Sequence, residues 1–139
     1  MRRIVPTLVM AGVVLAGPVA CGGQNTEALR RDAVGCSTYF TVLNAQILEG
    51  DPAFADRIMA ALVDPAAVDA DARSEEINRT LVEMSAGTDA WRAELPPEEV
   101  TTLDAEQTAL ARRHVAEDRS TEAAERISTC VETWERLDR

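Results

Sequence analysis

The sequence predicts an all-α fold, a small bundle of about four helices, on the strength of three observations. Apolar residues recur at alternating steps of three and four along much of the chain after residue 25, which is the spacing of a helix with one buried face. No segment alternates polar and apolar residues as a strand does, and no hairpin turn or internal repeat occurs. A length of 139 residues with 46% hydrophobic content suits a single domain and excludes a disordered chain.

The first helix is expected at residues 26–49. Its apolar stripe consists of Leu29, Ala33, Cys36, Phe40, Leu43 and Ile47. Because Cys36 belongs to this stripe, it should face the core. Gly50, Asp51 and Pro52 end this helix and begin the next, since glycine favours a helix end, aspartate an N-cap and proline the first helical position.

Two more segments precede the paired prolines at positions 96 and 97. The second helix should stop at Asp64 and Pro65, and its apolar face is Phe54, Ile58, Met59 and Leu62. A weaker pattern then develops into a third helix with the face Ile77, Leu81 and Met84, and with Gly87 as its C-cap. Residues 88–95 are expected to form a short turn in which Trp91 covers the core, with a ligand platform as the alternative role of Trp91.

The C-terminal segment, residues 97–139, carries two stripes of the same period. The first is Val100, Leu103, Gln107, Leu110 and His114, and the second is Ala123, Ile127, Cys130, Trp134 and Leu137. The polar residues 117–121 between them are compatible with a kink, a break or an exposed turn of one long helix. The pattern therefore leaves open whether this segment forms one helix or two.

The N-terminus has the parts of an export signal: basic Arg2 and Arg3, an uncharged run from residue 4 to residue 20, and then Cys21. Val19, Ala20 and Cys21 fit a lipobox, although Pro18 stands where an aliphatic residue is usual. This segment resembles the signal of a bacterial, specifically actinobacterial, lipoprotein precursor. The resemblance implies a signal peptide at residues 1–20, a lipidated Cys21 with a short linker at residues 21–25, and a helical domain at residues 26–139.

The lipoprotein resemblance places the domain at the cell membrane, held by its lipid anchor and facing outside the cytoplasm. Two alternatives stay open, namely a secretory signal that is cut elsewhere and an uncleaved membrane anchor. Cys21, Cys36 and Cys130 are an odd number, so assigning Cys21 to lipid leaves Cys36 and Cys130 for one disulfide bond in an exported domain. Two buried free thiols are the alternative, and no Cys-x-x-Cys spacing supports a metal site.

The charge balance excludes one class of partner. All 14 basic residues are arginine, they face 24 acidic residues, and the net charge of −10 offers nothing to neutralise phosphates, so no nucleic-acid partner is expected. Loss of residues 1–20 would take the net charge to about −12. The absence of lysine is typical of codon usage in a GC-rich bacterium.

His114 is the only histidine and lies on a predicted core stripe, so we expect it to be a hydrogen-bonded structural residue and not a catalytic base. Tyr39 flanks the first stripe, where packing is expected and a place at a binding surface is the alternative. No nucleophile–base pair or metal-ligand spacing is present, and therefore no enzyme activity, cofactor or metal is expected.

These observations predict a membrane-anchored extracytoplasmic lipoprotein that is not an enzyme and that binds an envelope protein partner or has a structural role. The alternative is a carrier for a small apolar ligand held between helices. An apolar cavity would favour the carrier, whereas a contiguous exposed apolar patch would favour the partner binder.

Overall fold

The structure, a computed structural model, describes residues 21–137, with side chains for residues 26–137. This part of the chain is all-α and contains six helices: α1 (Cys21–Glu49), α2 (Pro52–Leu62), α3 (Ala70–Gly87), α4 (Asp89–Glu94), α5 (Pro97–Ala116) and α6 (Ser120–Leu137). The all-α prediction is confirmed. The described residues contain five helices of 11 to 29 residues and the six-residue α4, where about four helices were expected.

The predicted signal peptide, residues 1–20, lies outside the described residues. Helix α1 begins at Cys21 and so includes the five residues that the sequence analysis assigns to a linker. The side chain of Cys21 is not among those described, and its lipidation stays a prediction.

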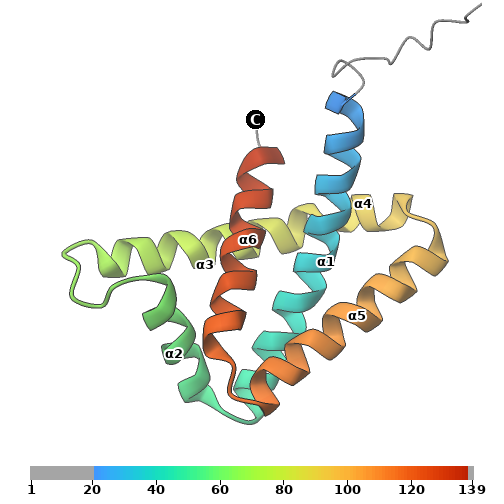
Figure 1. Ribbon diagram of the computed structural model, residues 1–139. Helices are drawn as coiled ribbons and strands as arrows, with labels where there is room; N and C mark the ends of the chain where they lie inside the picture. The colour runs from blue at the N-terminus through green and yellow to red at the C-terminus, as the bar shows by residue number, and fades with distance from the viewer. Residues whose placement is uncertain (1–20, 138–139) are drawn as a thin grey trace, which may run out of the picture.

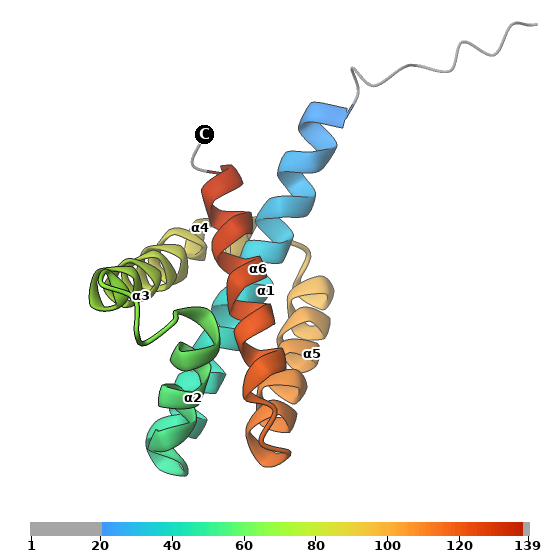
Figure 2. The ribbon, with the colours of Figure 1, turned by 60° about the vertical axis from the view of Figure 1, so that its left-hand side comes forward.

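The long helix α1 is the central element of the bundle (Figure 1). It contacts α5 most extensively, and α6 packs against both α1 and α2. Helix α3 crosses the bundle and contacts α1 and α6, as the second view also shows (Figure 2). The start of α1 and the end of α6 lie at the same end of the molecule (Figure 1).

One disulfide bond joins α1 to α6. Cys36 and Cys130 are 94 residues apart in sequence, and their Cα atoms are 5.6 Å apart. Both residues are buried in the core, whose other fully or nearly fully buried members include Tyr39, Leu43, Phe54, Ile58, Leu81, Met84 and Ile127. The predicted pairing is confirmed, and with it the prediction that the stripes of the first and last long helices face one core.

The C-terminal segment forms two helices because α5 ends in a well-defined turn. Asp118 has a φ of 52°, the left-handed conformation that commonly ends a helix. The Arg119 N–H donates to the His114 carbonyl at 2.7 Å, and the Asp118 N–H donates to the Val115 carbonyl at 3.2 Å, which together form a Schellman motif. The Asp118 carboxylate also pairs with Arg57 of α2 at 2.9 Å, so the turn is tied to a neighbouring helix.

Two predicted helix-end residues have other roles. No glycine in the described residues has a positive φ, so Gly87 is not the left-handed C-cap that was expected. A Cβ atom at Gly87 would lie 2.5 Å from the Trp134 indole, so the missing side chain makes room for that ring. Asp51 precedes α2 but makes no capping hydrogen bond, because its carboxylate accepts from Arg57 at 2.6 Å.

The predicted turn at residues 88–95 is largely helical, since α4 spans Asp89–Glu94. Trp91 on α4 lies with its ring centroid 5.8 Å from that of Trp134, which packs against the core. Trp91 also lies against the Arg30 guanidinium, 5.2 Å from its ring centroid, and its place over the core stays a prediction.

Candidate functional site

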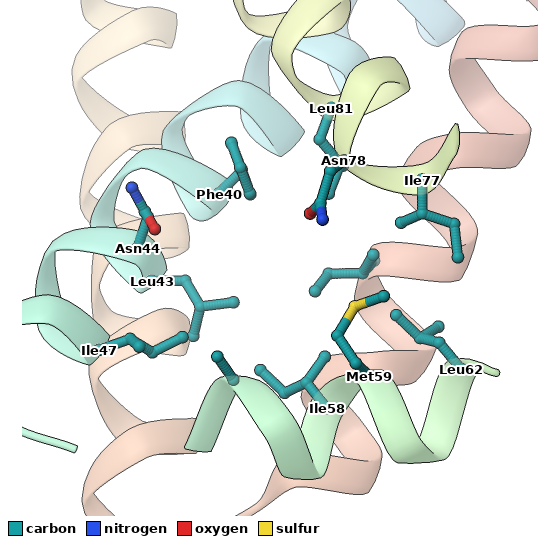
Figure 3. A pocket seen from close by; sticks show the side chains of 12 residues that line it. Phe40, Leu43, Asn44, Ile47, Ile58, Met59, Leu62, Ile77, Asn78 and Leu81 are labelled. Carbon is teal, nitrogen blue, oxygen red and sulfur yellow. The ribbon is translucent and has the colours of Figure 1, made fainter. Parts of the chain in front are cut away.

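An apolar cavity of about 180 Å³ opens between α1, α2, α3 and α6 (Figure 3). Its walls are made by twelve side chains: Phe40, Leu43, Asn44, Ile47, Ala55, Ile58, Met59, Leu62, Ile77, Asn78, Leu81 and Ile127. Leu43, Ile58, Leu81 and Ile127 belong to the buried core. The cavity is thus continuous with the core and opens to the surface.

The amphipathic stripes explain why the cavity walls are apolar. Leu43 and Ile47 of α1, Ile58 of α2 and Ile77 of α3 all lie on faces that the sequence analysis assigned to the core. Helix α3 crosses the bundle (Figure 1). Its residues Ile77, Asn78 and Leu81 form one wall of the cavity.

None of the twelve lining residues is charged, although 27% of the chain is. The two polar lining residues are Asn44 on α1 and Asn78 on α3, and both are exposed (Figure 3). An apolar cavity with a few polar groups is the usual form of a small-molecule site. This cavity can therefore bind an apolar group by burial, and it contains no side chain that acts as an acid, base or nucleophile at neutral pH.

A separate polar cluster joins α1, α4 and α5. Arg92 Nη1 donates to both carboxylate oxygens of Asp104 at 2.7 Å, and Arg92 Nη2 donates to the Thr38 hydroxyl at 2.6 Å. The Thr38 hydroxyl donates to Asp104 Oδ1 at 2.6 Å. Burial alone would raise the pKa of Asp104, but the hydrogen bonds from Arg92 and Thr38 outweigh burial, so the pKa lies below its ordinary value. These groups satisfy one another, and the cluster serves to hold α4 against its neighbours.

His114 and Tyr39 form a buried pair within the core. The Tyr39 hydroxyl and His114 Nδ1 are hydrogen-bonded at 2.7 Å, and their rings meet edge to face. Burial, together with the charge of Arg113, lowers the pKa of His114 below 6.5, and burial raises the pKa of Tyr39 above its usual range. His114 is hydrogen-bonded in the core, as expected. The alternative that Tyr39 belongs to a binding surface is wrong, because its side chain is fully buried.

Arg126 of α6 lies beside this pair and was not singled out from the sequence. Its Nη2 donates to the Gln107 side-chain oxygen at 3.0 Å, and its guanidinium lies 5.9 Å from the Tyr39 ring centroid. Burial lowers the pKa of Arg126 from its ordinary value, but arginine stays charged at any physiological pH. Through the hydrogen bond to Gln107 and the contact with the Tyr39 ring, Arg126 of α6 packs against α5 and α1 and has a structural role.

Sequence reasoning did not identify the cavity or the Arg92 cluster. The stripes mark Leu43, Ile47 and Ile58 as core residues, but nothing in their spacing shows that the facing helices leave a gap. Asn44 and Asn78 lie beside the predicted core faces and carry no pattern of their own. For the cluster of Arg92 and Asp104, the only available signal was Arg92, a charged residue within a short turn expected between two helices.

Comparison with known protein families, curated proteins and solved structures finds no match for this chain. Within residues 26–137, whose side chains the structure describes, no group of three or more His, Cys, Asp or Glu side chains is arranged to hold a metal ion. Across residues 21–137, no helix has the length and apolar character needed to span a bilayer.

Proposed function

We propose that this protein is a lipid-anchored, extracytoplasmic binding protein without enzymatic activity, and that it carries a small apolar ligand in the cavity between α1, α2, α3 and α6. The observation that carries the proposal is the cavity itself, about 180 Å³ in volume, lined by ten apolar side chains and no charged one. An engineered apolar cavity of about 150 Å³ binds benzene, so a cavity of this size suits a ligand group of about six carbons.

The sequence favours a protein partner, and the described surface gives that alternative less support. The large apolar side chains that are most exposed are Leu48 on α1, Val68 in the α2–α3 connection and Val82 on α3. Single exposed apolar residues are normal on soluble domains and need no partner to explain them. An apolar cavity open to the surface is the more specific feature, and for that reason we place ligand carriage first.

The location rests on two supports. The segment that ends at Cys21 resembles a lipoprotein signal, and the buried Cys36–Cys130 bond is typical of proteins that fold in oxidising compartments outside the cytoplasm. A lipid on Cys21 would hold the domain at the membrane surface through the N-terminus of α1. The acidic net charge of the chain would keep the domain itself from lying on anionic headgroups.

The expected affinity follows from the buried area of such a ligand. Each fully buried methylene contributes about 0.8 kcal/mol, so six carbons in this cavity, which is open to the surface, contribute at most about 5 kcal/mol. That free energy corresponds to a Kd of roughly 0.1–1 mM, and a measurement suited to weak binding is needed. Toluene is an appropriate probe because it is apolar and close to the size of the cavity.

The test is a titration of isotope-labelled protein with toluene, followed by the chemical shifts of backbone amides and side-chain amides in NMR spectra. The protein carries Cys21→Ser so that no acyl chain competes for the probe. We expect saturable shifts centred on α1, α2, α3 and α6. Absence of saturable shifts at these helices would refute the carrier function and return the protein-partner alternative to first place.

A pair of alanine substitutions on α2 supplies the matched control. Ala55 lines the cavity, whereas Ala60 on the same helix is exposed and lies outside the lining. Ala55→Leu should fill part of the cavity, weaken toluene binding at least tenfold and stabilise the fold by about 1–2 kcal/mol, because it adds three buried carbons without removing any. Ala60→Leu should leave both quantities almost unchanged.

The tether has an independent test. Wild type should incorporate labelled fatty acid and partition into detergent, whereas Cys21→Ser should incorporate no label and be left unprocessed or released. The chain has no lysine, so a processed protein whose amino terminus is also acylated has no primary amine and should not react with amine-directed dyes. A wild-type protein that takes up no label and partitions into water would overturn the lipoprotein assignment while leaving the cavity proposal intact.

A further inference from the structure

The two polar residues of the cavity indicate which ligands it accepts, and this inference rests on the carrier function proposed above. We infer that the cavity selects an uncharged amphiphile, a small molecule with an apolar body and one neutral hydrogen-bonding group, and that Asn44 and Asn78 bind that group. The ten other lining residues would contact the apolar body.

Asn44 on α1 and Asn78 on α3 lie on different walls of the cavity, and the Asn78 side chain extends toward the hollow (Figure 3). Among the described residues, neither side-chain amide has a hydrogen-bond partner within the protein. Both are exposed to water, so a ligand group can reach either of them without breaking an internal bond.

The cavity lining has no charged side chain to pair with an ionic ligand. A ligand carboxylate would leave water for a cavity without a single basic side chain, in a protein whose net charge is −10. A ligand ammonium would find no acidic side chain in the lining to pair with it. Burying a charge without a partner is costly, so both kinds of ion should bind more weakly than a neutral molecule of the same shape.

A side-chain amide offers two N–H donors and one carbonyl acceptor. It can therefore donate to, or accept from, an alcohol, and it can bind an ester or amide group equally well. The Asn78 amide extends toward the hollow, so a neutral group that binds it would be partly removed from water as the apolar body enters (Figure 3).

The experiment compares four probes that share one ring: toluene, benzyl alcohol, benzoate and benzylammonium. Each is titrated into the full chain carrying Cys21→Ser, and its Kd is measured from the same NMR shifts. A net hydrogen bond corresponds to about two- to tenfold in affinity, so benzyl alcohol should bind about two- to tenfold more tightly than toluene. Benzoate and benzylammonium should bind at least tenfold more weakly than benzyl alcohol.

Variants then assign the preference to the asparagines. The double substitution Asn44→Ala and Asn78→Ala removes both amides without filling the cavity, so toluene should bind as in the parent protein and the preference for benzyl alcohol should disappear. Gln46→Ala is the matched control, since it removes an amide from α1 at a half-buried position outside the cavity lining. It should leave both Kd values unchanged.

The outcomes separate this inference from the function on which it rests. If none of the four probes binds the parent protein, the carrier function itself is refuted. If toluene binds but benzyl alcohol binds no more tightly, or if either ion binds as tightly as the alcohol, only the selectivity is refuted. A preference for benzyl alcohol that persists in the double variant also refutes the assignment to Asn44 and Asn78.

Discussion

Removal of the Cys36–Cys130 bond should cost this fold much of its stability. The bond closes a loop with a sequence separation of 94 residues, and the chain-entropy relation for such a loop gives about 4.7 kcal/mol at 25 °C. Measured effects often fall below this value, so we expect the double substitution Cys36→Ala and Cys130→Ala to lower the free energy of unfolding by about 2–5 kcal/mol. Single domains have only about 5–15 kcal/mol in total.

The assay is urea unfolding monitored by circular dichroism, with helical content in water read from the same signal. The helices should persist, because α1 and α6 remain packed through Tyr39, Ile127 and their neighbours. The matched control is the wild-type protein unfolded in the presence of a reducing agent, which breaks the bond and keeps both sulfur atoms. A difference between the reduced protein and the double variant measures the small cavities that the alanines leave.

Three results would contradict this reasoning. A loss of less than about 1 kcal/mol in both the reduced protein and the double variant would mean that the unfolded chain is compact without the bond. Two free thiols titrated in the non-reduced exported protein, in addition to any thiol at Cys21, would mean that the bond does not form. Loss of most helical signal on reduction would mean that packing alone does not hold α1 and α6 together.

Three other substitutions give further predictions. The pKa of His114 is lowered in the folded state, so as the pH falls His114 is protonated in the unfolded chain before it is protonated in the folded protein. The free energy of unfolding should therefore decrease as the pH drops below about 6.5. His114→Gln should remove this loss in pH-dependent thermal melts, and it should preserve complementation of a deletion phenotype. Gly87→Ala should destabilise by about 1–3 kcal/mol in urea unfolding, since its Cβ would lie 2.5 Å from the Trp134 indole. Asp118→Gly should raise the free energy of unfolding by about 0.5–1 kcal/mol, because glycine adopts a φ of 52° without strain. The measurement is made at high salt, where the ion pair of Asp118 with Arg57 is screened. No gain at high salt would contradict the strain argument.

The sequence was sufficient to predict the helices and the bond between the first and the last of the long ones. Cys36 and Cys130 each lie on an apolar stripe of period 3.6, and residues on such stripes face a common core in any small bundle. The number of helices was less accessible. The break at Asp118 depends on a left-handed residue, and an aspartate in a polar stretch is only a weak signal for that conformation.

Long-range polar contacts were beyond the reach of the sequence for a different reason. Thr38, Arg92 and Asp104 come from three separate helices, and their hydrogen bonds form only once those helices are packed. A lone arginine in a segment expected to be a turn gives no indication of its partner 12 or 54 residues away. Periodicity reports which face of a helix is buried, but it does not report which residues meet across the interface.

The cavity follows from how α3 is held, and that is why periodicity could not predict it. Leu81 and Met84 in the second half of α3 are buried, and Gly87 leaves room for the Trp134 indole, so this half is fixed against the bundle. Most residues of the first half are exposed, and Ile77 and Asn78 lie over the cavity where the two halves meet. A side chain at position 87 would push this end of α3 away from Trp134 and change the space beneath Ile77. Gly87→Ala should therefore weaken toluene binding as well as stability. Asp118→Gly, which lies outside the cavity lining, should leave the toluene Kd nearly unchanged.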